Sequence, residues 1–168
     1  MNNLKSRLKL IGTVLCLFVV TAVQAEILPY VKVREVTDLQ AVGQEARGRK
    51  LPILIMFSIQ GCPYCDVVRE EFLKPMLRSG DYDDRVIMLE LYSDSYTQLR
   101  DFNGQLISSN ELTQRYKAGF APTVVFLDSR GNELAERLIG ITTRDFYGGF
   151  LDEAIDESLQ RIRNVATN

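Results

Sequence analysis

Two cysteines separated by two residues are the part of the sequence best suited to chemistry. The segment Cys62-Pro63-Tyr64-Cys65 follows an apolar run over residues 51–56 and precedes a segment of helical character over residues 66–73. This order predicts a strand that leads into a helix with Cys62 at its N-terminus. Unpaired N–H groups and the positive end of the helix dipole favour a thiolate there. We therefore expect Cys62 to be the nucleophile of a thiol–disulfide pair and Cys65 to resolve the mixed disulfide.

Other uses of the cysteine pair remain open on these residues alone. It could form a purely structural disulfide or supply half of a metal site. Structural zinc takes four ligands, commonly Cys and His, and the sequence contains no His, so a zinc site within one chain is disfavoured. A zinc or iron–sulfur site shared between subunits would receive a single pair from each chain. The lack of His also excludes Cys-His proteases and Ser-His-Asp hydrolases. We expect no metal site and no cofactor.

The N-terminus has the order of residues typical of a secretory signal peptide. Lys5, Arg7 and Lys9 precede an apolar stretch over residues 10–20, and Val23-Gln24-Ala25 supplies small residues for cleavage. This predicts a signal peptide over residues 1–25 and one domain over residues 26–168. An uncleaved anchor is the alternative, although the apolar stretch is shorter than the span of about 20 residues that a membrane requires. We expect a periplasmic location, where disulfides persist.

The leader also holds the third cysteine and part of the positive charge. Cys16 would leave with it; lipidation of Cys16 is disfavoured because Leu15 stands where processing prefers a small residue. The chain has 20 basic and 22 acidic residues, and loss of three leader cations lowers the net charge from −2 to −5. We therefore expect no nucleic-acid partner.

Beyond the leader, the hydrophobic pattern predicts alternating helices and strands. We expect a helix over 38–47, a buried strand over 51–58, the cysteine-bearing helix with an interruption at Pro75, a strand over 86–92, a helix that follows Ser108 and stops before Gly119, a strand over 123–127, a turn over 128–131, its hairpin partner over 133–139 and a long amphipathic helix from Thr143. Capping boxes are expected at Thr37 with Gln40 and at Ser108 with Glu111. The order predicts an α/β fold with a mixed central sheet flanked by helices on both faces.

Two charged segments are interpreted as surface. The cysteine-bearing helix is expected to have a solvated face, formed by Asp66, Arg69, Glu70 and Glu71. Residues 81–84 are rich in Asp but lack the regular ligand spacing and closing Glu of a calcium loop, so they predict a turn.

The chain resembles the thioredoxin superfamily from about Thr37 to Leu159. The likeness lies in residues 57–65 at the strand-to-helix turn, Ala121-Pro122-Thr123 before a strand, the hairpin turn over 128–133, and Gly140 before the last helix. The resemblance implies a thioredoxin-like fold. It also implies that the bond between Ala121 and Pro122 is cis, beside the nucleophilic cysteine, and that the backbone before Pro122 pairs with a substrate chain. Ala121, Pro122, Pro63 and Tyr64 are the expected substrate-binding residues.

Within the superfamily the chain is similar to exported bacterial thioredoxin-like proteins, including the periplasmic thioredoxins of sulfur-oxidation systems. The shared features are the segment over residues 61–65 and a segment like residues 101–104 before the third helix. Ordinary thioredoxins are shorter there, so residues 92–107 are expected to be an insertion, with a small hairpin or tight turn at Asn103-Gly104. The insertion could shape partner choice or be a plain surface loop.

Three positions depart from the thioredoxin pattern. Gly61 stands where thioredoxins have Trp, and Met56 stands where they have a buried Asp that aids proton transfer. The proton step must therefore use water, the backbone or another group. Ala121 replaces the Thr or Val of many exported relatives, which leaves the substrate preference open.

The resemblance implies an exported thiol:disulfide oxidoreductase that acts on protein disulfides or thiols, receives electrons from a membrane donor and works as a monomer. We favour reduction, because Pro63-Tyr64 lacks the His that strongly oxidising members often carry, and no large helical insertion is present. A disulfide-forming oxidant, an isomerase-like protein and a non-catalytic partner-binding or assembly factor remain alternatives. The pair could also hold Cu(I), but no Met or His cluster accompanies it.

Overall fold

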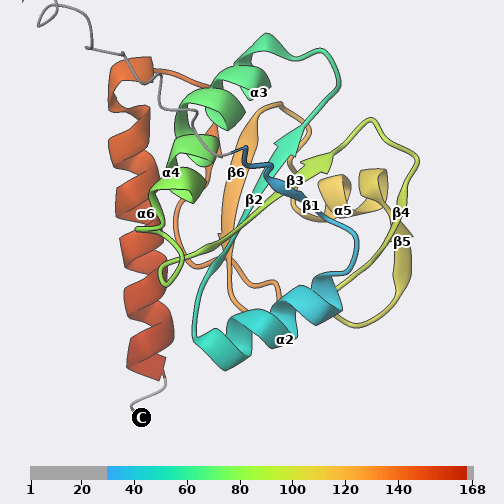
Figure 1. The fold of residues 1–168 in the computed structure, drawn as a ribbon. Helices are drawn as coiled ribbons and strands as arrows, with labels where there is room; N and C mark the ends of the chain where they lie inside the picture. Colours follow the sequence, from blue (N-terminus) through green and yellow to red (C-terminus); the bar gives the residue numbers. More distant parts are fainter. Residues whose placement is uncertain (1–29, 166–168) are drawn as a thin grey trace, which may run out of the picture. The chain divides into compact units, whose positions relative to one another are not determined.

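A five-stranded sheet organises the part of the chain that the computed structural model describes, residues 30–165 (Figure 1). Its strands are β1 (Arg34–Glu35), β2 (Ile53–Ser58), β3 (Ile87–Tyr92), β6 (Thr123–Leu127) and β7 (Leu138–Ile139), in the order β1-β3-β2-β6-β7. Strands β1 and β2 are parallel to β3, whereas β6 is antiparallel to β2 and β7 to β6. The predicted mixed sheet is confirmed. The predicted signal peptide lies outside the described residues and stays a prediction.

Helices cover both faces of this sheet, as predicted. They are α2 (Leu39–Arg49), α3 (Pro63–Val67), the π-helix η2 (Val68–Leu73), α4 (Lys74–Ser79), α5 (Ser109–Arg115) and α6 (Arg144–Val165). Helices α2 and α5 pack on one face, and the run from α3 to α4 packs with α6 on the other (Figure 1). No helix among residues 30–165 is long and apolar enough to cross a membrane.

Strand β2 shows why the sequence forms a two-faced core. All six of its residues are buried, and successive side chains point to opposite faces of the sheet. Ile53, Ile55 and Phe57 therefore pack with α2 and α5, while Leu54 and Met56 pack with the run from α3 to α4 and with α6. An apolar run without polar alternation is typical of such a central strand, because both of its faces are covered.

One of the two predicted N-terminal helix caps is confirmed, and the other is wrong. Ser108 caps α5, because its Oγ accepts the N–H of Glu111 at 3.1 Å. The predicted cap at Thr37 is wrong: Asp38 caps α2, and its Oδ1 accepts the N–H of Ala41 at 2.8 Å. A carboxylate at this position also interacts favourably with the positive end of the helix, which a Thr hydroxyl does less well.

The redox helix, defined here as the continuous run of α3, η2 and α4, passes through Pro75 instead of being interrupted there. The irregularity lies before the proline, where the N–H of Lys74 bonds to the carbonyl of Arg69, five residues back. Pro75 directly follows this wide turn, at the start of α4. The helix therefore reaches Ser79.

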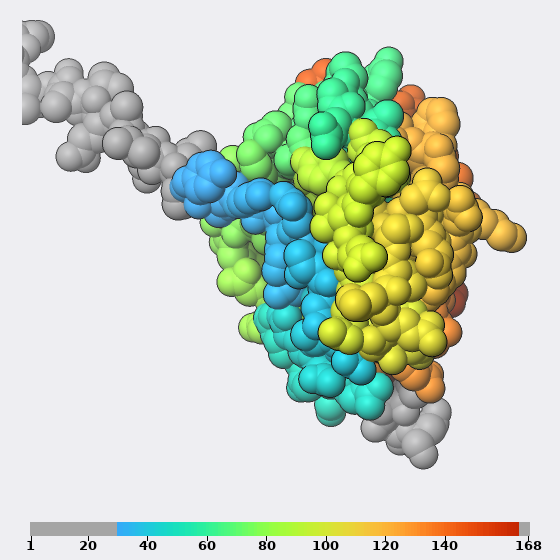
Figure 2. Space-filling model, turned by 90° about the vertical axis from the view of Figure 1, so that its right-hand side faces the viewer, coloured from blue at the N-terminus to red at the C-terminus, as the bar shows by residue number. Residues whose placement is uncertain are grey.

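One predicted hairpin belongs to the five-stranded sheet, and the other forms a separate two-stranded sheet. The predicted partner strand over 133–139 is shorter than expected: Glu133 forms an isolated bridge with Leu127, and pairing resumes at Leu138–Ile139. The predicted insertion does contain a hairpin, formed by β4 (Gln98–Arg100) and β5 (Leu106–Ser108). Figure 2 shows this segment on the surface beside the N-terminal strand, where the N–H of Arg100 bonds to the carbonyl of Thr37 at 2.9 Å.

A buried carboxylate holds the turn of this insertion. The side chain of Asp101 is fully buried. Its Oδ1 accepts the N–H groups of Asn103 and Gln105, each at 2.9 Å, and its Oδ2 accepts Nη1 of Arg115 at 2.8 Å. Burial alone would raise the pKa of Asp101, but the bonds from Arg115 and the two backbone groups outweigh it and lower the pKa. Asp101 thus joins the insertion to α5.

We predict that D101N lowers the free energy of unfolding by about 1–3 kcal/mol at pH 7, because Asn removes the charge that Arg115 pairs with. A carboxyl group with a lowered folded pKa stabilises above its unfolded pKa of about 3.9, and this contribution is lost as pH falls through the folded value. The difference between wild type and variant should therefore shrink at pH 3. Urea unfolding followed by circular dichroism measures both values, and D84N, at an exposed position, is the control. An equal difference at both pH values would contradict this assignment.

Candidate active site

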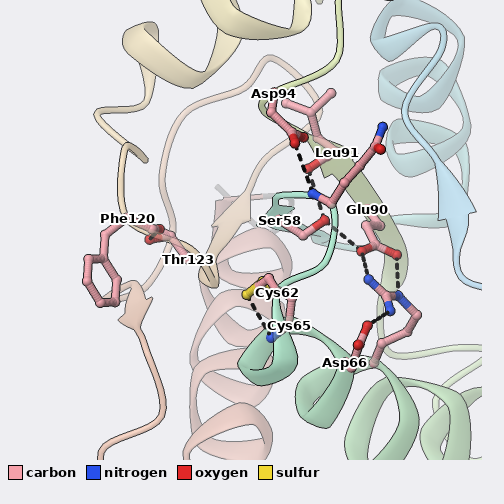
Figure 3. Close-up of a disulfide and its surroundings, with 11 residues drawn as sticks. Ser58, Cys62, Cys65, Asp66, Glu90, Leu91, Asp94, Phe120 and Thr123 are labelled. Carbon is pink, nitrogen blue, oxygen red and sulfur yellow. Dashed lines mark hydrogen bonds and ion pairs between the residues drawn. A yellow bond between two sulfur atoms is a disulfide. The ribbon is translucent and has the colours of Figure 1, made fainter.

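The redox helix begins at the cysteine pair, which forms a disulfide in the structure (Figure 3). The Cα atoms of Cys62 and Cys65 are 5.2 Å apart. Cys62 is the N-cap of α3, and its Sγ accepts the N–H of Cys65 at 3.2 Å. Pro63 follows at the first helical turn, where its fixed φ suits the helix and no N–H is needed. The structure therefore places Cys62 at the helix N-terminus, as the sequence predicted.

The two sulfur-bearing residues differ in exposure. Cys65 is completely buried, whereas Cys62 is 8% exposed and Tyr64 is 65% exposed. Gly61 has a φ of +66°, which lets the chain turn from β2 into α3. A Trp at that position would occupy the left-handed region with strain, which gives a physical reason for the departure from the thioredoxin pattern. Cys62 therefore reaches the surface in part, and Cys65 lies entirely inside.

The expected substrate-binding residues lie at the same end of the sheet as the redox loop, defined here as residues 59–62 between β2 and α3. Thr123 pairs with Phe57 in the register of β6 and β2, so Ala121 and Pro122 continue beyond the end of β2. The bond between Ala121 and Pro122 is cis. Figure 3 shows the loop with Phe120 and Thr123 on one side of the disulfide. Phe120 is 63% exposed, so this loop presents an aromatic side chain to solvent.

A charged network on the other side of the disulfide was missed in the sequence (Figure 3). The prediction that Arg69 is solvated is wrong: its side chain is 15% exposed and pairs with Glu90, which is 3% exposed. Oε1 of Glu90 accepts Nη2 of Arg69 at 2.6 Å, and Oε2 accepts Nε at 2.8 Å. The bond to Glu90 is the main cause that raises the pKa of Arg69. A glutamate in the middle of the apolar run over 86–92 was the available signal.

Carboxylates outnumber cations around the redox loop. A recess of about 430 Å³ opens beside the loop, and its charged lining residues are Glu35, Asp66 and Arg69. Arg69 also donates through Nη1 to Oδ1 of Asp66 at 2.5 Å. The carboxylate of Asp94 accepts the N–H of Gln60 at 3.0 Å and so fixes the loop before the cysteines. Glu35 is itself paired with Lys32 at 2.7 Å, so Asp66 and Asp94 are the rim carboxylates that oppose the effect of the helix N-terminus on a thiolate.

Fold and site together define a thioredoxin-fold protein with a cysteine pair in disulfide form. A family model for a thioredoxin-like domain matches residues 39–155, and the chain belongs to this family. The predicted superfamily and fold class are confirmed. No curated protein matches the sequence.

Solved structures support the same fold. DsbH oxidoreductase has a TM-score of 0.56 and 17% identity, with 79% of this chain and 95% of that one covered. A thioredoxin from Malassezia sympodialis has a TM-score of 0.51 and 18% identity, with coverage of 78% and 96%. A poplar thioredoxin h mutant has a TM-score of 0.52 and 15% identity, with coverage of 80% and 92%. At these identities the likeness establishes the fold.

We predict that the reduced protein is alkylated at Cys62 at least ten times faster than at Cys65. Cys62 is 8% exposed at the helix N-terminus, whereas Cys65 is completely buried. Brief treatment with iodoacetamide at pH 7, followed by peptide mass spectrometry, measures the two rates. Labelling of both cysteines in unfolded protein is the control for intrinsic reactivity. Equal labelling of the two in the folded protein would contradict the assigned roles.

Proposed function

We propose that the protein is an exported thiol:disulfide oxidoreductase that reduces disulfides in partner proteins. The observation that carries this proposal is the disulfide at a helix N-terminus, with Cys62 at the surface edge and Cys65 buried behind it. A structural disulfide needs no such asymmetry. Family membership supports the proposal, because a redox cysteine pair at this turn is what the thioredoxin-like domain carries.

The chemistry follows from the two positions. The Cys62 thiolate attacks one sulfur of a partner disulfide; that S–S bond breaks, the second partner sulfur leaves as a thiolate, and a mixed disulfide forms. Cys65 loses its proton to solvent and attacks Sγ of Cys62, which releases the first partner sulfur. The partner gains two electrons and two protons, and the Cys62–Cys65 disulfide forms. A membrane thiol donor then returns two electrons to the pair.

The surface around the pair is suited to a protein partner. Tyr64 and Phe120 are exposed aromatic residues on the two segments that meet at the disulfide. The carbonyl of Pro122 already accepts the N–H of Gly140 at 2.8 Å, so the backbone before the proline is what remains to pair with a partner chain. We propose that Ala121, Pro122, Pro63 and Tyr64 receive an extended segment of the partner in this way.

The charges around the pair favour the reducing direction. A thiolate that is strongly stabilised makes the reduced form stable and the pair oxidising. In this site the carboxylates of Asp66 and Asp94 flank the loop, and the cation Arg69 is already neutralised by Glu90. The helix N-terminus is thus the main element that stabilises the thiolate, and a negative rim offsets part of its effect.

We predict that C62S abolishes reduction of insulin disulfides by the processed protein, with a loss of at least 100-fold, because the attacking sulfur is gone. C65S should retain the first attack and accumulate mixed disulfides, which non-reducing gels detect. Y96S, at an exposed position of the insertion, is the control and should keep full turnover. Full turnover in C62S would refute the proposal and favour a non-catalytic partner-binding factor.

The reduction potential of the same processed protein decides the direction of the reaction. Equilibration in glutathione buffers, followed by mass-shifting alkylation, should give a potential close to the thioredoxin value of about −270 mV. A potential near −120 mV, typical of strong oxidants, would make the protein a disulfide-forming oxidant. The alkylation readout is needed because the sequence has no Trp to report the redox state by fluorescence.

We propose that the protein acts in the periplasm after cleavage at Ala25, as a monomer without a nucleic-acid partner. The basic and apolar order of the leader and the negative net charge support this. When the full chain is expressed in a bacterium, we predict that the periplasmic fraction contains a protein that begins at Glu26. Replacement of Lys5, Arg7 and Lys9 by Gln should leave the precursor uncleaved in the cytosol. Recovery of the full-length wild-type chain in the membrane would show an anchor instead.

A further inference from the structure

The carboxylate of Glu90 is the most enclosed charged group near the redox pair. It is 3% exposed, and three hydrogen bonds hold it (Figure 3). Oε1 accepts one from Oγ of Ser58 at 2.7 Å and one from Nη2 of Arg69 at 2.6 Å. Oε2 accepts one from Nε of Arg69 at 2.8 Å. The guanidinium thus binds the carboxylate through two parallel bonds, the strongest geometry for such a pair.

This ion pair lies under the redox loop. Glu90 is the register neighbour of Met56, so both side chains point to the face of the sheet that the redox helix covers. Ser58 is the last residue of β2, four residues before Cys62. Arg69 lies one helical turn after Cys65, and Gly61 and Arg69 line the same recess. Ser58 and Arg69 therefore attach Glu90 to the two segments that flank the cysteines.

Met56 occupies the position that thioredoxins give to a buried Asp, so this position is apolar here. The carboxylate of Glu90 lies beside it on the neighbouring strand β3. Both oxygens of Glu90 are engaged as acceptors, so this carboxylate is arranged to hold a cation. The pair as a whole is neutral. In a low-dielectric environment, a neutral pair and either of its separated charges affect a nearby thiolate very differently.

We propose that Glu90 and Arg69 are a positioning pair that sets the reduction potential of the Cys62–Cys65 disulfide, by holding the redox helix on β3 and by cancelling each other's charge beneath the thiols. This inference rests on the proposed oxidoreductase function. Other titratable groups that face the loop are Glu35 from β1, which pairs with Lys32 at 2.7 Å, Asp66 from α3, Tyr92 from β3 and Asp94 from the segment after β3. Of these groups, Asp66 alone is bonded to the pair, through Nη1 of Arg69.

The two partners should act with opposite sign. In E90Q the guanidinium keeps its charge and its bond to the exposed Asp66 but loses its buried counter-ion, so the Cys62 thiolate is favoured and the pair becomes more oxidising. In R69Q the carboxylate keeps its charge, so the thiolate is disfavoured and the pair becomes more reducing. Reduction breaks the S–S bond and adds two electrons and two protons, which two glutathione thiols supply as they form one glutathione disulfide. Stabilising the thiolate therefore stabilises the reduced form.

The test is the equilibrium constant with glutathione, measured by mass-shifting alkylation, together with the Cys62 thiol pKa from the pH dependence of its alkylation rate. We expect E90Q to shift the constant at least threefold towards the reduced protein, and R69Q at least threefold the other way. The double variant E90Q/R69Q, which is again neutral, should return to within twofold of wild type. Circular dichroism confirms folding of each variant before measurement.

The control is D156N, which removes a more exposed ion pair with Arg85 (2.7 Å), just before the start of β3 and far from the cysteines in sequence. It should leave the constant within twofold of wild type. Shifts of the same sign in E90Q and R69Q, or no shift in either, would show that the pair has a purely structural role. If R69Q does not fold, E90Q decides alone, because Gln is isosteric and can still accept the Ser58 hydroxyl.

The result of this test does not depend on whether the proposed oxidoreductase function is correct. The glutathione equilibrium needs no protein partner and no turnover, so opposite shifts would support the pair even if insulin were not reduced. Conversely, full insulin reduction with unshifted potentials in E90Q and R69Q would leave the proposed function intact and overturn this inference.

Discussion

A carboxylate buried beneath the redox helix needs a cation at a fixed place, and this requirement links the elements that build the site. An ionised carboxylate without a partner in the interior costs several kcal/mol, so Glu90 is compatible with folding because Arg69 reaches it. Arg69 belongs to the helix that begins at Cys62, and Ser58 belongs to the strand that leads to it. The height and rotation of the redox helix on the sheet are therefore set by a charge pair as well as by apolar packing.

The wide turn of that helix lets the charge pair and the core coexist. Val68 and Leu73 are five residues apart and both fully buried in the same core cluster. In a regular α-helix, residues five apart differ by about 140° around the axis, so one of the two would face away from the core. The π-helical turn brings both inward. Because Arg69 and Lys74 share that spacing and the bond between them closes the turn, Arg69 is held where Glu90 needs it.

The sequence predicts those features that depend on local pattern. The cysteine spacing, the three long strands, the cap at Ser108 and the long final helix each follow from neighbouring residue types. Features that depend on contacts between distant segments were missed. Nothing local to Arg69 distinguishes it from the solvated residues around it, since its partner lies 21 positions away on a strand whose neighbours are unknown from sequence. A two-residue strand such as β1 also gives no periodic signal.

The burial of the charges decides which of them can control the cysteines. Asp66 is 61% exposed at the side chain, so water and salt screen much of its effect on a thiolate. Glu90 and Arg69 are screened far less, because they are enclosed between the sheet and the redox helix. Their mutual neutralisation therefore matters more than the number of acidic residues on the rim. With that pair intact, the field at Cys62 is governed by the backbone dipoles of the helix N-terminus, which are fixed by the fold and do not titrate.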